Sequence, residues 1–339
     1  MNILFYCPFK FSLKSKNIKS LGGIESLNID LGKNLSKSYN NLYLATFCNK
    51  EVRQGKLTNI PIKKLTNKMS NYKFDKIISS NDPTIFNLSK NTENFLWLHN
   101  KLPIEKAFRK KKLFSILRNK ISCVFVSNYL KKNTPSIYNF KSKYVIPNFI
   151  NTDFTNNRPK FLRKPYFVWS VQRKKGLHTI LDIWKNKVYN NNNQAKLFIF
   201  GISKNNISKK KVRNFYQYNI FFKGRVSKKE LIKQYNVSMG MICLGYDETF
   251  CLNAIESYAC GLPILTFGLT AVSEISTKKN SFRGSNFNHI YKYIVFLSEM
   301  NAKSRKKLID NCVNYSKKYY IKNVIGKWIK LLKVSPNVE

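Results

Sequence analysis

Short apolar runs alternate with polar stretches along the whole chain. In the first half such runs cover residues 2–9, 41–47, 76–79, 95–99, 122–127 and 143–150. After the first run, Leu27, Leu31 and Leu35 recur at the spacing of one helix face. Runs this short and this apolar are typical of buried strands, and strands that alternate with helices indicate a parallel sheet covered on both faces. The first half therefore predicts an α/β domain.

The second half repeats the alternation. Apolar runs cover residues 166–171, 197–201, 219–226, 239–244 and 263–267. Ser227 and Glu230 have the spacing of a capping box and predict a helix start. The polar stretch 155–164, with Pro159 inside it, predicts a linker. We therefore expect two Rossmann-like domains, at 1–158 and 159–320, followed by an amphipathic helix within 321–339.

The composition is that of a folded but very basic protein. Hydrophobic residues make up 43% of the chain, which is enough for sizeable cores, while the net charge is +44. Such a charge favours polyanionic partners, either nucleic acid or anionic lipid. The lysines, however, are spread over almost every segment together with many asparagines, a pattern typical of a coding bias at solvent-facing positions. No nucleic-acid-binding motif is present, so we predict no nucleic-acid partner and a secondary electrostatic contact with anionic membranes.

The cysteines and histidines do not predict a metal site. The seven cysteines are scattered without a C-x-x-C pair, and there are three histidines. Buried free thiols are expected in a reducing cytoplasm. The first apolar run is too short for a signal peptide, and no run approaches the length of a membrane-spanning helix. These features predict a cytoplasmic protein.

The stretch 246–263 combines features that bind sugars and phosphates. A buried run ends at Gly245, two acids follow at 247 and 248, and Thr249 is placed to cap a helix. Glu256 lies inside that helix, about two turns after Glu248. Free amides at a helix start bind phosphate, carboxylates bind hydroxyls, and a nucleotide-sugar offers both. The alternative is structural, since acids near a helix start also complement its dipole.

The same stretch resembles the signature of the retaining GT-B glycosyltransferases called group 1 or family 4, written Glu-x-Phe-Gly-Leu-x-x-x-Glu-Ala-x-Ala-x-Gly-x-Pro. The matching positions are Glu248, Phe250, Leu252, Glu256, Ala259, Gly261 and Pro263. Cys251 replaces the family's glycine and Ser257 an alanine. A side chain at 251 is expected to restrict the backbone φ to negative values and to crowd the phosphate.

The resemblance implies a fold and a reaction. The fold would be GT-B: two Rossmann-like domains facing each other across a cleft, an acceptor-side domain followed by a nucleotide-sugar domain, with the last helix crossing back to the first. The reaction would move a sugar from a nucleotide-sugar donor to a hydroxyl of a glycan or lipid-linked acceptor, with retention, in cell-envelope polysaccharide or lipopolysaccharide synthesis. It would need no metal ion and no cofactor.

The resemblance also assigns roles to residues. In the second domain, Glu248 would orient the transferred sugar and Glu256 would bind the ribose. The amides around Cys251 and Leu252, together with Lys175, would stabilise the departing diphosphate.

Further donor-side positions are implied with less direct roles. Arg173 would replace the family's arginine, because Trp169 and Ser170 occupy the Gly-Arg positions. Phe250 lies in the signature, and Arg225 would lie near the base. In the first domain, Gly22 and Gly23 would border the cleft, and His99, at the end of a strand, would reach the sugar or the acceptor.

Three alternatives remain open from the sequence. The first is a GT-B enzyme of another reaction, such as a nucleotide-sugar epimerase. The second is an inactive GT-B relative that acts as a binding partner. The third, motivated by the charge of +44, is a nucleic-acid-binding protein.

Overall fold

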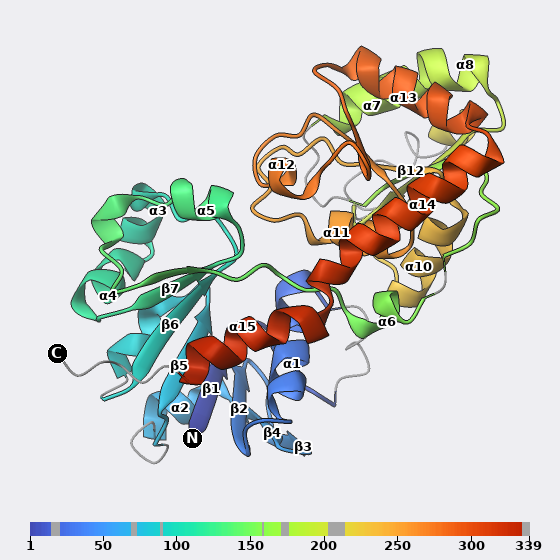
Figure 1. Cartoon of the computed structure of the whole chain (residues 1–339). Coiled ribbons are helices and arrows are strands. Elements are labelled where there is room, and N and C mark those ends of the chain that lie inside the picture. The colour runs from blue at the N-terminus through green and yellow to red at the C-terminus, as the bar shows by residue number, and fades with distance from the viewer. Residues whose placement is uncertain are drawn as a thin grey trace. The chain divides into compact units, whose positions relative to one another are not determined.

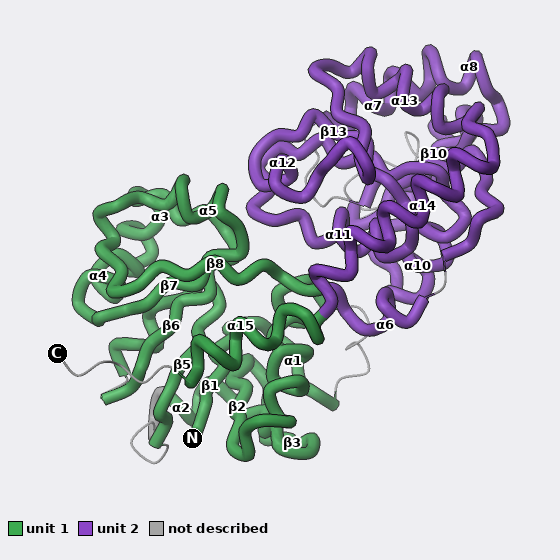
Figure 2. The backbone as a smooth tube through the Cα atoms, in the orientation of Figure 1, with its two compact units in different colours: residues 1–149, 321–339 green, residues 150–320 purple. Residues whose placement is uncertain are grey.

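The chain is divided into two compact units. The structure is a computed structural model, and it describes residues 1–14, 21–68 (backbone only at 66–68), 73–88, 91–157, 159–170, 176–202 and 214–333. Unit 1 comprises Met1–Phe149 and Ile321–Glu339, and unit 2 comprises Ile150–Tyr320 (Figure 2). The division after Phe149 lies earlier in the chain than the boundary after residue 158 that the linker composition suggests.

Unit 1 is built on an eight-stranded sheet in the order β3-β4-β2-β1-β5-β6-β7-β8. The strands are β1 Asn2–Tyr6, β2 Asn41–Thr46, β3 Val52–Gln54, β4 Leu57–Pro61, β5 Lys76–Ser80, β6 Glu93–Leu98, β7 Ser122–Phe125 and β8 Lys143–Val145. All pairs are parallel except β3 with β4, a hairpin that the apolar pattern did not predict. The central strands are buried almost throughout, as expected when helices cover both faces.

Helices surround this sheet (Figure 1). They are α1 Gly23–Leu35, α2 Ile62–Lys68, η3 Pro83–Leu88, α3 Ile104–Arg109, α4 Lys112–Arg118, α5 Asn128–Lys132, η4 Ser136–Tyr138 and α15 Ile321–Lys333. The apolar stripe at Leu27, Leu31 and Leu35 of α1 is buried, which confirms the helix that its spacing predicts.

The last helix of the chain, α15, belongs to unit 1. Its apolar residues repeat at helical spacing, and Val324, Trp328 and Leu332 are buried. The helix lies beside α1 (Figure 1). Trp328 also packs on Trp97 of β6. Unit 1 is therefore completed by a segment that follows unit 2 in the sequence.

Unit 2 contains a six-stranded parallel sheet in the order β11-β10-β9-β12-β13-β14. Its strands are β9 Tyr166–Trp169, β10 Lys196–Phe200, β11 Ile220–Gly224, β12 Gly240–Ile242, β13 Ile264–Thr266 and β14 Ser281–Arg283. Because every pair is parallel, the loops that follow β9 to β13 leave from one edge of the sheet. Ligands bind at this carboxyl edge in open α/β sheets.

The helices of unit 2 are α6 Thr152–Thr155, α7 Leu177–Ile183, η5 Trp184–Val188, α8 Tyr189–Asn191, α10 Lys228–Val237, α11 Leu252–Ala259, α12 Val272–Ile275, α13 Phe287–Glu299, α14 Ala302–Ser316 and η7 Lys317–Tyr319. Ser227 caps α10 and forms the predicted capping box with Glu230. The basic segment 209–213 lies outside the described residues.

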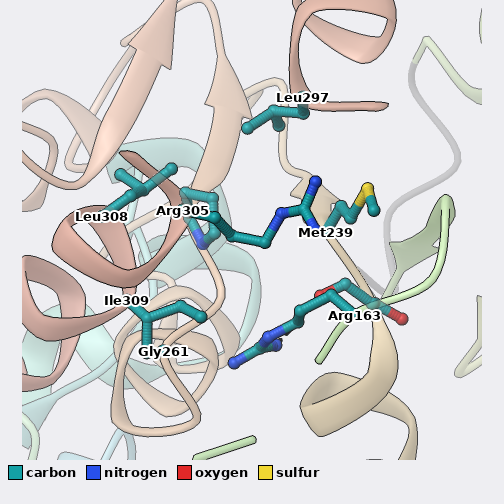
Figure 3. Close-up of a pocket in the computed structure, with 9 residues that line it drawn as sticks. Arg163, Met239, Gly261, Leu297, Arg305, Leu308 and Ile309 are labelled. Carbon is teal, nitrogen blue, oxygen red and sulfur yellow. Dashed lines mark hydrogen bonds between the residues drawn. The ribbon is translucent and has the colours of Figure 1, made fainter. Parts of the chain in front are cut away.

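A buried arginine joins three segments at the opposite edge of this sheet. The Arg163 guanidinium donates to the carbonyl oxygens of Tyr235 at 2.6 Å, Ser238 at 2.9 Å and Cys260 at 2.7 Å. It lines a small pocket with Met239, which precedes β12 (Figure 3). This pocket lies at the amino ends of β12 and β13, so we assign it to packing and not to ligand binding.

Candidate functional site

The loop between β12 and α11 is held in an unusual backbone conformation. Gly245, Asp247 and Cys251 have φ of 86°, 54° and 64°, all in the left-handed region. Such angles are uncommon for residues with a side chain and cluster at functional sites. The loop leaves the sheet at its carboxyl edge and returns directly into α11. It therefore presents the 246–252 segment at the edge where α/β sheets bind ligands.

A second loop supports the first. The Thr270 hydroxyl donates to the Gly245 carbonyl at 2.7 Å, and the Ala271 amide donates to the Glu248 carbonyl at 3.3 Å. A Cβ on Gly245 would lie 2.9 Å from the Leu269 carbonyl oxygen. Position 245 therefore requires glycine twice, for its positive φ and for this close approach.

Cys251, and not Thr249, is the N-cap of α11. The cap has no side-chain hydrogen bond, so the predicted cap at Thr249 is wrong. The expectation of a negative φ at Cys251 is also wrong, because φ is 64°. The cysteine takes the left-handed conformation usual for glycine and carries its side chain inward, where it is buried. A residue with a side chain thus occupies a left-handed position at the start of α11.

The buried thiol of Cys251 has a sulfur neighbour. Its Sγ lies 3.3 Å from Sγ of Cys243, at the end of β12. The hydrogen bond with Cys243, followed by burial, raises the pKa of Cys251 well above its usual value. The Cys251 thiol therefore stays protonated at neutral pH, and the two sulfurs pack together beneath the loop.

The two signature carboxylates lie in different surroundings. Glu248 is half-buried on the loop. Glu256 lies on the first turns of α11 and is only 6% exposed. Its charge is one cause of the raised pKa of Tyr235, after the burial of that tyrosine. Glu256 is therefore held deep in unit 2, whereas Glu248 is the more accessible of the two.

The start of α11 is anchored to the central strand of the sheet. The Asn253 side-chain amide donates to the carbonyl oxygen of Ser170, directly after β9. The Ser170 hydroxyl lies 2.7 Å from the hydroxyl of Tyr235. Ser170 stands where the resembling family has an arginine. In this chain its carbonyl oxygen holds the start of the helix that carries the signature. Its polar environment could not be inferred from the sequence.

The basic residues predicted to hold the diphosphate come directly before Gly176 in the sequence. Lys175 and Arg173 lie outside the described residues. Gly176, the next residue after Lys175, has a φ of 84°, and a Cβ there would lie 2.4 Å from Leu244 Cδ1. Gly176 thus packs against the start of the signature loop. Arg225 is exposed just after β11.

Phe250 and Leu252 flank the N-cap and differ in burial. Phe250 is 5% exposed, and its ring packs edge to face on Tyr319 with centroids 5.8 Å apart. Leu252 begins α11 and is half-buried. The aromatic ring thus packs in the core of unit 2, while the start of the helix remains nearer to solvent.

In unit 1, Gly22 and Gly23 open α1. Gly22 is its N-cap, and a Cβ on Gly22 would lie 2.5 Å from Oε2 of Glu25 in the first turn. Gly23 is exposed. The absence of a side chain at Gly22 leaves room for the Glu25 carboxylate at this helix start, where it complements the helix dipole.

His99 follows β6 at the carboxyl edge of the same sheet. Its backbone amide donates to Oδ1 of Asn81 at 2.7 Å, and its ring lies 4.4 Å from that of Trp97. The residue is 4% exposed, and burial lowers its pKa to about 3. The imidazole is therefore neutral at neutral pH.

Four polar residues at this edge were not predicted. Asn81 has a φ of 59°, and its carbonyl accepts from Lys112 Nζ at 2.6 Å. Lys112 also lies 3.6 Å from Asp82. Burial, followed by the charge of Asp82, raises the pKa of Tyr6 to about 12. The signal in the sequence was their position, since Tyr6 ends β1 and Asn81 and Asp82 follow β5.

The described residues were also considered as metal ligands and as membrane spans, and they provide neither. They contain no group of three or more His, Cys, Asp or Glu side chains that could hold a metal ion. None of their helices is long and apolar enough to cross a bilayer.

The comparisons with known proteins agree with this architecture. Residues 151–314 match the family described as Glycosyl transferases group 1. No curated protein matches the sequence significantly.

Solved structures match nearly the whole chain at low identity. Sucrose-phosphate synthase from Thermosynechococcus elongatus has a TM-score of 0.73 at 15% identity, covering 98% of both chains. WaaG, a glycosyltransferase involved in lipopolysaccharide biosynthesis, has a TM-score of 0.71 at 10% identity, covering 98% of this chain and 100% of its own. Trehalose-6-phosphate from E. coli bound with UDP-2-fluoro glucose scores 0.72 at 10% identity, covering 99% and 100%.

The predicted α/β fold with two Rossmann-like domains is confirmed by the two parallel sheets and by these neighbours. The chain has the GT-B fold, and from residue 151 to residue 314 it matches the group 1 glycosyltransferases.

Proposed function

We propose that this protein is a retaining, metal-independent glycosyltransferase of family 4, which moves a sugar from a nucleotide-sugar to an acceptor hydroxyl. One observation carries the proposal. The segment that bears the signature residues is a strained loop at the carboxyl edge of the unit 2 sheet, and it leads directly into the amide-rich start of α11. Loops in this position receive ligands, and helix starts receive phosphates.

We assign the donor to this loop. The amides of Cys251 and Leu252 at the start of α11, with Lys175 and Arg173, would hold the diphosphate. Glu248, half-buried on the loop, would accept hydrogen bonds from hydroxyls of the transferred sugar. Glu256, deeper on α11, would bind the ribose. Arg225, exposed after β11, would lie on the side of the base.

The proposed chemistry is electrostatic. The bond between the anomeric carbon and the diphosphate oxygen breaks, and the acceptor oxygen bonds to that carbon on the same face. The acceptor proton passes to the departing diphosphate. Positive charge develops on the sugar and negative charge on the leaving group, which fixed amides and basic side chains stabilise. Basic groups would then do the work that a metal ion does elsewhere.

His99 of unit 1 receives a positioning role toward the sugar or the acceptor. Because burial lowers its pKa to about 3, the ring is neutral at neutral pH and would hydrogen-bond without carrying charge. We assign Gly22 and Gly23, which open α1 in the same unit, to the same part of the site as His99.

We further propose an acceptor and a compartment. A glycan or lipid-linked acceptor of the cell envelope suits a protein of net charge +44, since anionic membranes attract basic proteins. A cytoplasmic location, with the protein peripheral on the membrane, agrees with seven cysteines that are all free thiols.

The test is a panel of uridine, guanosine and adenosine diphosphate sugars, measured by hydrolysis and by the rise in melting temperature. One donor should be hydrolysed slowly, and its nucleoside diphosphate should stabilise the protein. Glu248→Gln should reduce turnover about 10²-fold or more, since one contact to the reacting group is worth that much. The matched control is Glu299→Gln, an exposed carboxylate at the end of α13, which should leave turnover unchanged.

The alternatives give different results in the same assay. A nucleotide-sugar epimerase would convert the donor into its epimer and release no free sugar. An inactive relative would be stabilised by the nucleotide without turnover. No stabilisation by any nucleotide, or a Glu248→Gln variant as active as the wild type, would remove the donor-site assignment.

A further inference from the structure

An exposed apolar surface lies on two neighbouring short helices of unit 1. Ile104 and Phe108 are 44% and 60% exposed on α3, and Phe114 and Leu117 are 61% and 50% exposed on α4. The spacing of each pair, four and three residues, places its members on one helix face. The rings of Phe108 and Phe114 have their centroids 5.9 Å apart, so the two helices present one continuous surface. We call these four residues the α3–α4 surface.

Exposed basic residues alternate in the sequence with the four residues of the α3–α4 surface. Six of them are exposed between residues 104 and 120, namely Lys106, Arg109, Lys110, Lys111, Arg118 and Lys120. The acidic residue of this stretch is Glu105. The local excess of positive charge is therefore combined with large apolar side chains. Scattered exposed apolar residues need no explanation, but a cluster of them on elements that also carry many exposed charges marks an interaction site.

The combination of apolar and basic side chains distinguishes between three possible partners of the α3–α4 surface. A second copy of this chain would bring six like charges against six, which opposes association. Nucleic acid would satisfy the charges, and bases can stack on phenylalanine, but Ile104 and Leu117 have no flat ring to stack. A bilayer interface accepts aliphatic and aromatic side chains alike, beside lysines that meet lipid phosphates.

We propose that the α3–α4 surface docks on an anionic lipid bilayer. The four apolar side chains enter the boundary between headgroups and acyl chains, and the flanking lysines and arginines contact lipid phosphates. Docking uses unit 1 alone and does not depend on the donor site. It would hold the enzyme at the surface where lipid-linked acceptors lie, but it can be measured without any sugar transfer.

The experiment is co-sedimentation of the full chain with vesicles of phosphatidylglycerol and phosphatidylcholine, and with vesicles of phosphatidylcholine alone. The wild type should bind the anionic vesicles and not the neutral ones. Phe108→Ser with Phe114→Ser should weaken binding more than about tenfold, because each phenylalanine loses burial in the bilayer. The matched control is Phe161→Ser with Phe296→Ser, two phenylalanines of unit 2 that are each 52% exposed.

Charge is tested separately. Lys110→Glu with Lys111→Glu should weaken binding at least about fivefold for each lysine removed. Lys278→Glu with Lys279→Glu, an exposed pair of adjacent lysines in unit 2, should have a clearly smaller effect. Equal losses from both pairs would mean that total charge alone drives binding, and would overturn the proposal.

Two further outcomes would also overturn it. One is vesicle binding by the Phe108→Ser and Phe114→Ser variant equal to that of the wild type. The other is a loss of duplex DNA binding by this variant while vesicle binding persists, which would assign the surface to nucleic acid. Unchanged melting temperatures establish that each variant is folded, and Ile104→Ser with Leu117→Ser repeats the test without touching an aromatic ring.

Discussion

Trp97 of β6 and Trp328 of α15 meet edge to face, with ring centroids 4.8 Å apart and ring planes at 69°. Both side chains are fully buried. Edge-to-face pairs of this kind add to the stabilisation from burial alone. The contact joins the middle of the first sheet to the last helix of the chain. Unit 1 thus depends on residues that follow the whole of unit 2 in the sequence.

Trp328→Ala should therefore destabilise unit 1. Loss of a fully buried tryptophan costs about 3–5 kcal/mol of unfolding free energy, because it removes apolar burial and leaves a cavity. Hydrogen exchange resolved by segment is the measurement, since it reports each unit separately. Amides of β1, β5 and β6 should exchange faster, while those of β9 and β12 keep their protection. Lys327→Ala, an exposed neighbour on α15, is the control, and equal exchange in both variants would contradict the prediction.

Arg163 should be equally important for unit 2. Arg163→Met removes the donor for three buried carbonyl oxygens and should cost about 3 kcal/mol or more. Arg163→Lys should not restore stability, because an ammonium group cannot reproduce the fork of the guanidinium. The midpoint of urea unfolding measures the effect. Lys160→Ala, exposed in the same segment, is the control, and a lysine variant with wild-type stability would refute the assigned role.

Alanine substitutions at two glycines with positive φ should distinguish the cost of backbone strain from the cost of a steric clash. Gly55→Ala, with φ of 60° and no atom within 4 Å of its new Cβ, should cost about 1 kcal/mol. Gly245→Ala has a similar φ but places Cβ 2.9 Å from the Leu269 carbonyl oxygen, so it should cost clearly more. It should also reduce donor turnover, because the signature loop must shift. Equal melting temperatures for the two variants would show that the loop absorbs the clash.

The lowered pKa of the buried His99 should make the folded protein less stable in acid. Its pKa in the folded chain is about 3, below the ordinary value of 6.5. Between these values the unfolded chain takes up a proton that the folded chain does not, so stability falls as pH drops below about 6.5. At pH 5 the titration of His99 should lower the free energy of unfolding by about 2 kcal/mol.

The comparison is between melting temperatures at pH 7 and pH 5. The drop in His99→Phe should be smaller than in the wild type, since the variant lacks the titrating group. His178→Phe, which changes a histidine with a 91% exposed side chain, should show the wild-type drop. If His99→Phe loses as much stability as the wild type on acidification, His99 is not the group responsible.

Much of the fold follows from local pattern. The apolar runs that became β1, β5, β6, β9 and β12 are visible in the sequence because strands covered on both faces need continuous apolar residues. The capping box at Ser227 is equally local. The hairpin of β3 and β4 was missed, since β3 is short and largely exposed at the edge of the sheet.

The site divides in the same way. The order of residues in the signature makes Glu248 and Glu256 candidates for sugar binding, because carboxylates beside a helix start can bind hydroxyl groups next to a phosphate. The conformation of Cys251 was predicted wrongly from its Cβ, because the surrounding loop and the sulfur of Cys243 hold it in the left-handed region. No local rule contains those contacts.

By itself, the sequence indicated most of the buried strands, the division into two α/β domains, and the stretch that carries the candidate chemistry. These depend on residues that are close together in the chain. The family resemblance led us to expect that the last helix returns to the first domain, but only the tertiary structure decided which contacts α15 makes there. It alone also decided that Arg163 joins three segments of unit 2 and that His99 is buried and neutral. Each of these depends on contacts between distant residues, whose burial and hydrogen bonds exist only once the chain has folded.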